Sequence, residues 1–239
     1  MSRDLAAIAD DLAPSGTLRA SINLGNPVLA QGTPEAPSGV TVDLARALAE
    51  RLDVPVDLLC FDAARTSFEA LTSGRADVSF LAVEPARAEQ VVFTAPYVLI
   101  EGVYAVPEDS PLRTVADVDA AGVRIGVKLG SAYDLFLTRT LARATLVRGD
   151  EGTDAFLAEG LEAAAGIRQS MTTFVAGHRG VRLIDERFME IRQAMATTRS
   201  RAEATTDYLR AFVEEQKASG FVAAALARAG QADATVAPS

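Results

Sequence analysis

The sequence has no tryptophan, one cysteine and one histidine among its 239 residues. A single cysteine excludes an internal disulfide bond, and one cysteine with one histidine cannot supply the ligands of a zinc site. Cys60 lies in an apolar run, residues 54–61, whereas His178 lies in a glycine-flanked turn, so nothing joins them as nucleophile and base. The acidic residues show no calcium-loop spacing. We therefore expect no metal and no other cofactor.

Positive charge is scarce as well. The 23 Lys and Arg residues stand against 32 Asp and Glu residues, which gives a net charge of -9. A chain of this charge repels phosphate backbones and anionic lipids, and no basic run offsets the repulsion, so we expect no nucleic acid as a partner. No stretch approaches the roughly 18 consecutive apolar residues that span a bilayer, so we also expect no membrane insertion.

The N-terminal segment lacks the apolar core of an export signal, because Asp4, Asp10 and Asp11 interrupt it. The segment has the pattern of an ordinary short helix instead. As it stands, the sequence predicts a cytoplasmic protein. A periplasmic location stays open if an export signal has been trimmed from the chain.

What the sequence does contain is an alternation of short apolar runs with segments of helical periodicity. This pattern predicts an α/β fold with a mostly parallel sheet whose two faces are covered by helices. A complete β-α-β-α-β set precedes about Gly102 and a second set follows the break at Pro107, so we expect two units. The expected strands are residues 17–24, 56–61, 77–83, 104–106, 123–127, 145–148, 181–184 and 189–196. The expected helices are residues 42–52, 67–73, 133–141, 156–161, 201–219 and 221–229.

Open α/β sheets bind ligands outside the carboxyl ends of their strands, so the loops after strands are the candidate sites. The first of these loops runs from Glu84 to Arg87, directly after the apolar strand expected to end at Val83. An arginine in this place can offer its planar guanidinium to a carboxylate through two hydrogen bonds. The alternative is a surface arginine paired with Glu89, with Glu84 as a plain helix-capping residue.

Two further loops follow strands. Gly130 and Ser131 come before an expected helix, where unpaired backbone N–H groups and a hydroxyl suit an anion, although Ser131 could simply cap the helix. Asn26 lies at the start of a loop rich in glycine and proline, residues 25–39. Its side chain could reach a ligand or hold its own turn.

These residues belong to an ordered series of short motifs that covers roughly residues 15–230. The motifs, in chain order, are residues 17–22 (TLRASI), 39–49 (GVTVDLARALA), 68–77 (FEALTSGRAD), 84–87 (EPAR), 93–97 (FTAPY), 126–131 (GVKLGS) and 220–221 (GF). Each motif alone is weak, but seven in order form a specific signal. The series resembles the polar amino acid family of bacterial solute-binding proteins, family 3, which has the type II periplasmic-binding-protein fold.

The resemblance implies a fold of two lobes, each a mostly parallel sheet flanked by helices. We expect lobe 1 to comprise residues 1–102 and 198–239, and lobe 2 to comprise residues 103–197. The chain would cross between the lobes near residues 102–106 and 194–197, a two-strand hinge. A small solute with a carboxylate, either an amino acid or a related organic acid, would lie between the lobes.

The resemblance also implies roles for individual residues. Arg87 would hold the ligand's carboxylate, and Gly130 and Ser131 would donate hydrogen bonds to the same group. The remaining residues expected to line the ligand are Ala82, Glu84, Asn26, Ala132, Arg168 and Gln169. An ABC transporter permease or a sensor protein is implied as a further partner.

Two departures from the family pattern bear on the ligand. The loop after the first strand has no aromatic residue to stack on it. The aspartate that binds the ammonium group in the family falls near Ile167, where no acid is available, and burying an ammonium without a carboxylate is costly. Either Glu84 binds the amine, or the ligand has no amine and Arg168 binds a second carboxylate.

Three functions fit this sequence. The first is a binding protein for uptake or sensing, which the sequence favours. The second is an enzyme that resembles the cyclohexadienyl dehydratases, in which Glu84 or Glu101 would act as general acid. The third is a cytoplasmic ligand sensor that works with a protein partner.

Overall fold

The computed structural model describes residues 3–239; Met1 and Ser2, which the sequence assigns to lobe 1, lie outside the described residues. The chain divides into two compact units, which we call unit 1 (residues 1–99 and 192–239) and unit 2 (residues 100–191). Two long strands, β6 (Val91–Pro107) and β10 (Val181–Thr198), extend from one unit into the other. The predicted crossings at residues 102–106 and 194–197 lie within these two strands.

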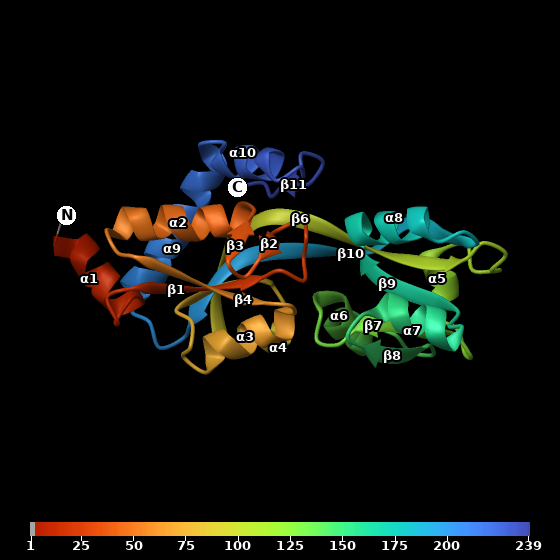
Figure 1. Cartoon of the computed structure of the whole chain (residues 1–239). Coiled ribbons are helices and arrows are strands. Elements are labelled where there is room, and N and C mark those ends of the chain that lie inside the picture. Colours follow the sequence, from red (N-terminus) through yellow and green to blue (C-terminus); the bar gives the residue numbers. More distant parts are fainter. Residues whose placement is uncertain (1–2) are drawn as a thin grey trace. The chain divides into compact units, whose positions relative to one another are not determined.

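Unit 1 is built on a sheet in the order β4-β1-β5-β10, in which β1 is parallel to β4 and β5, and β10 is antiparallel to β5. Figure 1 shows α2 on one side of this sheet and α3 on the other. The strands of this unit are β1 (Leu18–Asn23), β2 (Gln31–Thr33), β3 (Ala36–Ser38), β4 (Val56–Phe61), β5 (Val78–Ala82) and β11 (Thr235–Val236). Its helices are α1 (Arg3–Leu12), α2 (Val40–Leu52), α3 (Ala64–Thr72), α4 (Pro85–Ala88), α9 (Glu203–Ala218) and α10 (Phe221–Arg228).

The strand β5 explains why the sheet of unit 1 is covered on both faces. All five of its residues are buried, and none is charged. Successive side chains of a strand point to opposite faces, so a strand that is uncharged and buried throughout has cover on both sides. The charged groups near this strand therefore lie at its two ends, where Asp77 precedes it and Glu84 and Arg87 follow it.

Unit 2 contains a sheet in the order β6-β9-β7-β8, with β7 parallel to β8 and β9 and with β6 antiparallel to β9. Val103 and Ala105 belong to one hydrophobic cluster, whereas Tyr104 and Val106 belong to another. This alternation along β6 places one cluster on each face of the sheet. The other elements of the unit are α5 (Val115–Val118), β7 (Arg124–Lys128), α6 (Ala132–Thr140), β8 (Thr145–Gly149), α7 (Gly152–Glu159), β9 (Ala163–Ile167) and α8 (Arg168–Gly177).

A close approach of two backbones fixes α7 against β7. A Cβ atom added to Gly126 would lie 2.2 Å from the carbonyl oxygen of Gly152, and one added to Gly152 would lie 2.6 Å from the carbonyl oxygen of Gly126. Only glycine has room at such a contact. The two glycines therefore set how closely this helix packs on the sheet of unit 2.

The α/β fold predicted from the sequence is confirmed, and some elements differ from the expected ones. The loop expected at residues 25–39 contains a short hairpin, β2–β3. Residues 181–198 form one strand, where two were expected, because charged residues at positions 185–187 point to solvent and interrupt the apolar pattern without ending the strand. The strand expected at residues 104–106 begins at Val91. No helix within residues 3–239 has both the length and the hydrophobicity that crossing a bilayer requires.

Candidate ligand-binding residues

Arg87 lies on α4, the single turn of helix that follows β5. The helix begins with Pro85, whose fixed φ suits the first helical position, and it ends within a few residues. The side chain of Arg87 turns back toward the strand, is 3% exposed, and donates from Nη1 to the carbonyl oxygen of Ala82 at 3.3 Å. Its guanidinium carbon lies 6.0 Å from the centre of the Phe68 ring. Arg87 is therefore a buried cation held between a strand end and an aromatic ring.

Burial sets the electrostatics of Arg87. Removing the guanidinium from water lowers the pKa of Arg87 to about 10, against the attraction of the Glu84 charge, which acts in the opposite direction. The side chain is thus still charged at neutral pH. A cation with this degree of burial gains more from a bound carboxylate than a solvated one would, because the surrounding dielectric is low.

Glu84 lies beside Arg87 at the start of α4 and is 2% exposed. Its backbone carbonyl oxygen accepts hydrogen bonds from the N–H groups of Arg87, at 3.0 Å, and Ala88, at 2.9 Å. Its carboxylate does not cap the helix, in contrast to the capping role that the sequence left open. Unit 1 therefore places a buried acid next to the buried arginine.

Asn26 has a role within its own turn. Its Oδ1 accepts from the N–H of Val28 at 3.2 Å, and its carbonyl oxygen accepts from the N–H groups of Leu29 and Ala30, both at 3.0 Å. The side chain is 8% exposed. This is the second of the two roles that the sequence allowed, and the contact with a ligand stays a prediction.

The turn at Gly130 and Ser131 links β7 to α6 in unit 2. Gly130 has a φ of 69°, in the left-handed region, and Ser131 begins the helix with its Oγ accepting from the N–H of Asp134 at 3.1 Å. Asp134, which is 3% exposed, accepts in return from the N–H of Gly130 at 2.8 Å. Arg148 donates from Nε to the same carboxylate at 2.9 Å.

These bonds change which groups of the turn can serve a ligand. The N–H of Gly130 donates to Asp134, and the N–H of Ser131 donates to the carbonyl oxygen of Lys128 at 3.1 Å. The groups that suit an anion are the hydroxyl hydrogen of Ser131 and the N–H groups of Ala132 and Tyr133, which come too early in the helix to have an acceptor within it. Asp134 was absent from the predicted site, although Ser131-x-x-Asp134 has the spacing of a capping box.

Arg168 is the first residue of α8, and its guanidinium is held within unit 2. Its Nε donates to Glu101 and its Nη2 donates to the carbonyl oxygen of Asp185 at 2.6 Å. Glu101 also accepts from Nη1 of Arg187 at 3.3 Å. If Arg168 is to bind a second carboxylate of the ligand, that carboxylate has to compete with Glu101. If Glu101 is to act as a general acid, it has to break its bonds to Arg168 and Arg187.

Gln169 follows Arg168, and its Oε1 is buried with no hydrogen-bond partner among residues 3–239. An unpaired buried acceptor is uncommon in folded proteins, and a donor on a bound molecule would satisfy it. The same residues contain no group of three or more His, Cys, Asp or Glu side chains that could hold a metal ion.

Sequence comparison places the chain among known proteins. The family described as bacterial extracellular solute-binding proteins, family 3, matches residues 23–231. The chain belongs to this family. Comparison with curated proteins gives no match.

Solved structures with the fold of this family 3 protein are similar along nearly their whole length. A mutant of ArgBP from T. maritima has 22% sequence identity and a TM-score of 0.75, and the similarity covers 92% of this chain and 98% of that chain. AbpA from Streptococcus pneumoniae, an amino acid ABC transporter substrate-binding protein bound to L-arginine, has 18% identity and a TM-score of 0.75 over 92% and 97% of the two chains. AncCDT-1, an ancestral amino acid-binding protein and a precursor of cyclohexadienyl dehydratase, has 18% identity and the same TM-score over 92% and 97%. At this identity the similarity shows the fold, and the predicted type II periplasmic-binding-protein fold is confirmed.

Proposed function

We propose that this family 3 protein binds a small solute that carries a carboxylate, either an amino acid or a related organic acid, and that Arg87 is the main anchor. The observation that carries the proposal is the burial of a charged guanidinium at the carboxyl end of β5, the end at which open α/β sheets bind ligands. A bidentate pair with a carboxylate would use the planar geometry of this group.

We propose that the turn at Ser131 and Ala132 in unit 2 supplies further donors to the same carboxylate. The left-handed conformation of Gly130 and the bonds to Asp134 fix this turn before any ligand binds. A preorganised turn loses little entropy on binding. Arg87 and the turn belong to different units, so the solute would stabilise the arrangement in which both reach it.

The buried Glu84 supports an amine on the solute. Two of the similar proteins are described with arginine bound, AbpA and ArgBP. A buried carboxylate beside the carboxylate anchor suits an α-ammonium group. We therefore place an amino acid ahead of an amine-free acid, for which Arg168 would have to exchange Glu101 for the ligand.

We propose an ABC transporter permease or a sensor protein as the partner of the loaded protein, in line with the description of AbpA as an ABC transporter substrate-binding protein. For the cellular location we keep the sequence-based proposal of a cytoplasmic protein, with the periplasm as the alternative. Fractionation of cells that express the full-length gene product would distinguish the two. Recovery in the osmotic-shock fraction would overturn the first.

Thermal unfolding in the presence of single amino acids, dicarboxylates and keto acids tests the proposal. We expect one chemical class to raise the unfolding temperature of the wild-type protein and to leave that of Arg87→Ala unchanged. Arg65→Ala is the matched control, because Arg65 lies on the neighbouring α3 in an exposed pair with Glu69. Equal stabilisation of wild type and Arg87→Ala would overturn the anchor role.

The second candidate function is an enzyme on the same scaffold, and the observation that favours it is the buried Glu84. AncCDT-1, which shares the fold, is itself described as an amino acid-binding protein. Glu84 would then donate a proton to the solute as a general acid. Proton NMR of each stabilising solute after prolonged incubation distinguishes the two functions. A solute recovered unchanged supports binding, and a solute converted to product supports catalysis.

A further inference from the structure

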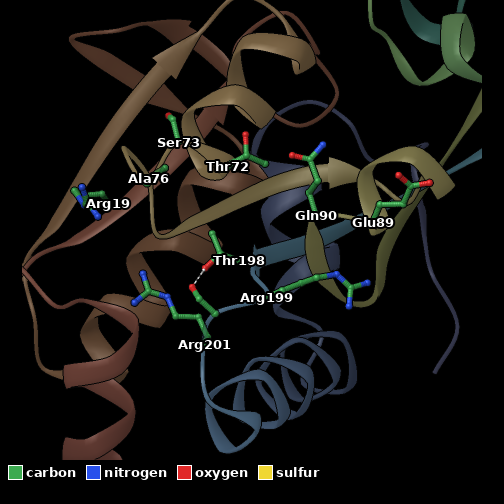
Figure 2. A pocket seen from close by; sticks show the side chains of 11 residues that line it. Arg19, Thr72, Ser73, Ala76, Glu89, Gln90, Thr198, Arg199 and Arg201 are labelled. Carbon is green, nitrogen blue, oxygen red and sulfur yellow. Dashed lines mark hydrogen bonds between the residues drawn. The ribbon is translucent and has the colours of Figure 1, made fainter.

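A pocket lined mainly by polar and charged residues lies within unit 1 at the amino end of β5. It has a volume of about 660 Å³, and its lining includes Arg19, Arg199, Arg201, Thr72, Glu89 and Gln90. Figure 2 shows Arg19 and Arg201 on one side of Thr198, and Arg199 with Glu89 and Gln90 on the other. The guanidinium of Arg87 lies at the carboxyl end of the same strand, where it bonds to Ala82.

One buried carboxylate organises the first side of the pocket. Asp77 is fully buried, and it accepts from Nε of Arg19 at 3.0 Å and from Nη2 of Arg19 at 2.7 Å. Arg201 also donates to Asp77 from Nη2, at 2.9 Å. Two guanidinium groups thus share the carboxylate of Asp77, although Asp57 also attracts Arg19 and the carboxylate of Asp11 accepts from the N–H of Ala202 at 3.0 Å.

The remaining bonds of Arg201 and Arg199 go to uncharged groups. Arg201 donates from Nη1 to the backbone oxygen of Asp11, and Arg199 donates from Nη2 to the backbone oxygen of Ala88. The Nε–H of Arg201 is buried and has no acceptor among residues 3–239, although its side chain is 14% exposed. An unpaired buried donor of this kind is rare.

The charge of the pocket contrasts with the charge of the chain. Three arginines line it against Glu89 and the buried Asp77, whereas the whole sequence has a net charge of -9. Composition therefore predicts a surface that repels anions, and this pocket is a local exception. Its volume lies within the range of small-molecule sites, roughly 300–1,000 Å³. Hydroxyl and amide groups of Thr72 and Gln90 add uncharged partners.

We propose that this pocket binds a small molecule bearing phosphate or carboxylate oxyanions, which Arg19 and Arg201 hold at one side and Arg199 holds at the other. Guanidinium groups bind both oxyanions through paired N–H donors. The site is separate from the proposed solute site, and it does not depend on the identity of that solute.

Isothermal titration calorimetry of the full chain tests the proposal, with inorganic phosphate in one arm and citrate in the other, both at constant ionic strength. We expect saturable binding of at least one of them, and no binding when sodium chloride replaces the anion. The arm with the tighter binding assigns phosphate or carboxylate as the preferred oxyanion. Absence of binding in both arms overturns the proposal.

Two substitutions locate the binding. Arg199→Gln removes an exposed cation at one side, and Arg201→Lys removes the planar fork at the other while keeping a positive charge beside Asp77. Each should weaken the anion affinity by about tenfold or more, the usual contribution of a hydrogen bond to a charged group. Arg210→Gln is the matched control, because Arg210 lies in an exposed pair with Asp207 on α9.

The variants also separate this site from the proposed solute site. Arg87→Ala should keep the anion affinity of the wild type, and Arg201→Lys should keep the affinity for the solute. Wild-type anion affinity in both Arg199→Gln and Arg201→Lys would overturn the proposal. Loss of anion affinity in Arg87→Ala would also overturn it, because the anion would then occupy the solute site.

Discussion

Replacement of Arg87 by methionine is the sharpest test of the idea that this arginine serves a ligand and not the fold. The side chain is 3% exposed, and burial lowers its pKa to about 10 even though the neighbouring Glu84 charge acts to raise it. Because the lowered pKa already includes the attraction of Glu84, it measures the net cost of the charge in the folded protein. One pH unit of pKa difference corresponds to about 1.4 kcal/mol, so the charge costs roughly 3 kcal/mol of stability.

The sign of this effect follows from linkage. The pKa of Arg87 is lower in the folded protein than in the unfolded chain, so the unfolded state binds its proton more tightly and folding is opposed by the charge. This cost is fully present at every pH below about 10, and it disappears only as the pH rises above that value. At neutral pH, an uncharged side chain of similar length should therefore stabilise the ligand-free protein. Methionine is uncharged and of similar length, and its thioether suits the neighbourhood of the Phe68 ring, whose centre lies 6.0 Å from the guanidinium carbon.

We expect Arg87→Met, made together with Glu84→Gln so that no buried carboxylate is left without its cation, to raise the free energy of unfolding of the ligand-free protein by up to about 3 kcal/mol and to abolish solute binding. Urea unfolding followed by circular dichroism measures the first quantity, and calorimetric titration with the solute measures the second. A stabilised protein that no longer binds is the signature of a side chain kept for function. The reasoning is refuted if the double variant unfolds at lower urea concentration than the wild type, since the buried pair would then hold the fold together.

Three other substitutions address other parts of the chain. Glu84→Gln should weaken the affinity for solutes that carry an amine by about tenfold and leave the affinity for amine-free acids unchanged. Calorimetric titration with matched pairs of solutes would show the difference. Asp134→Asn should lower stability by about 2 kcal/mol and weaken carboxylate binding, because the buried acid loses its charge-assisted bond to Arg148. Gly126→Ala should cost about 3 kcal/mol in urea unfolding, because its Cβ would meet the carbonyl oxygen of Gly152 at 2.2 Å.

Two exposed positions supply matched controls for these substitutions. Asp154→Asn, at an exposed position of α7, should change stability by less than about 0.5 kcal/mol. Gly177→Ala, in α8 with no atom near its Cβ, should leave stability unchanged or raise it. If Glu84→Gln loses affinity equally for acids with and without an amine, Glu84 does not bind the amine. Wild-type stability of Asp134→Asn or of Gly126→Ala would show that the turn or the helix contact is not tightly packed.

The sequence predicted the elements whose signals are local. The apolar period from Val42 to Leu52 predicted the helix that the structure forms at Val40–Leu52, and the glycine at position 220 predicted the break before α10. The β2–β3 hairpin was missed, because its six residues carry no apolar alternation and include Pro37. Glycine and proline are typical of loops, and here they form a small exposed hairpin.

Contacts of the candidate site can likewise be predicted from the sequence only where the two partners are close along the chain. Asp134 lies three residues after Ser131, so its bond to the turn could have been recognised from the capping pattern. The pairing of Glu101 with Arg168 could not, because it spans 67 residues and depends on the register that places Gly102 opposite Ile167. Sequence periodicity predicts which face a residue takes, but the register between two distant strands is set by the packing of the whole sheet.

The two proposed sites share one strand, and this limits how they can influence each other. The five residues of β5 are buried and uncharged, so the sheet keeps its charges at the two ends, with Asp77 before the strand and Arg87 after it. At about 3.3 Å per residue, the backbones of Asp77 and Ala82 are roughly 16 Å apart. Substitutions this far apart normally have additive effects on stability. The change in the free energy of unfolding of a double variant at Arg87 and Arg201 should therefore equal the sum of the changes in the two single variants. A departure from additivity would mean that the two ends of β5 are energetically coupled, and that occupation of one site is then felt at the other.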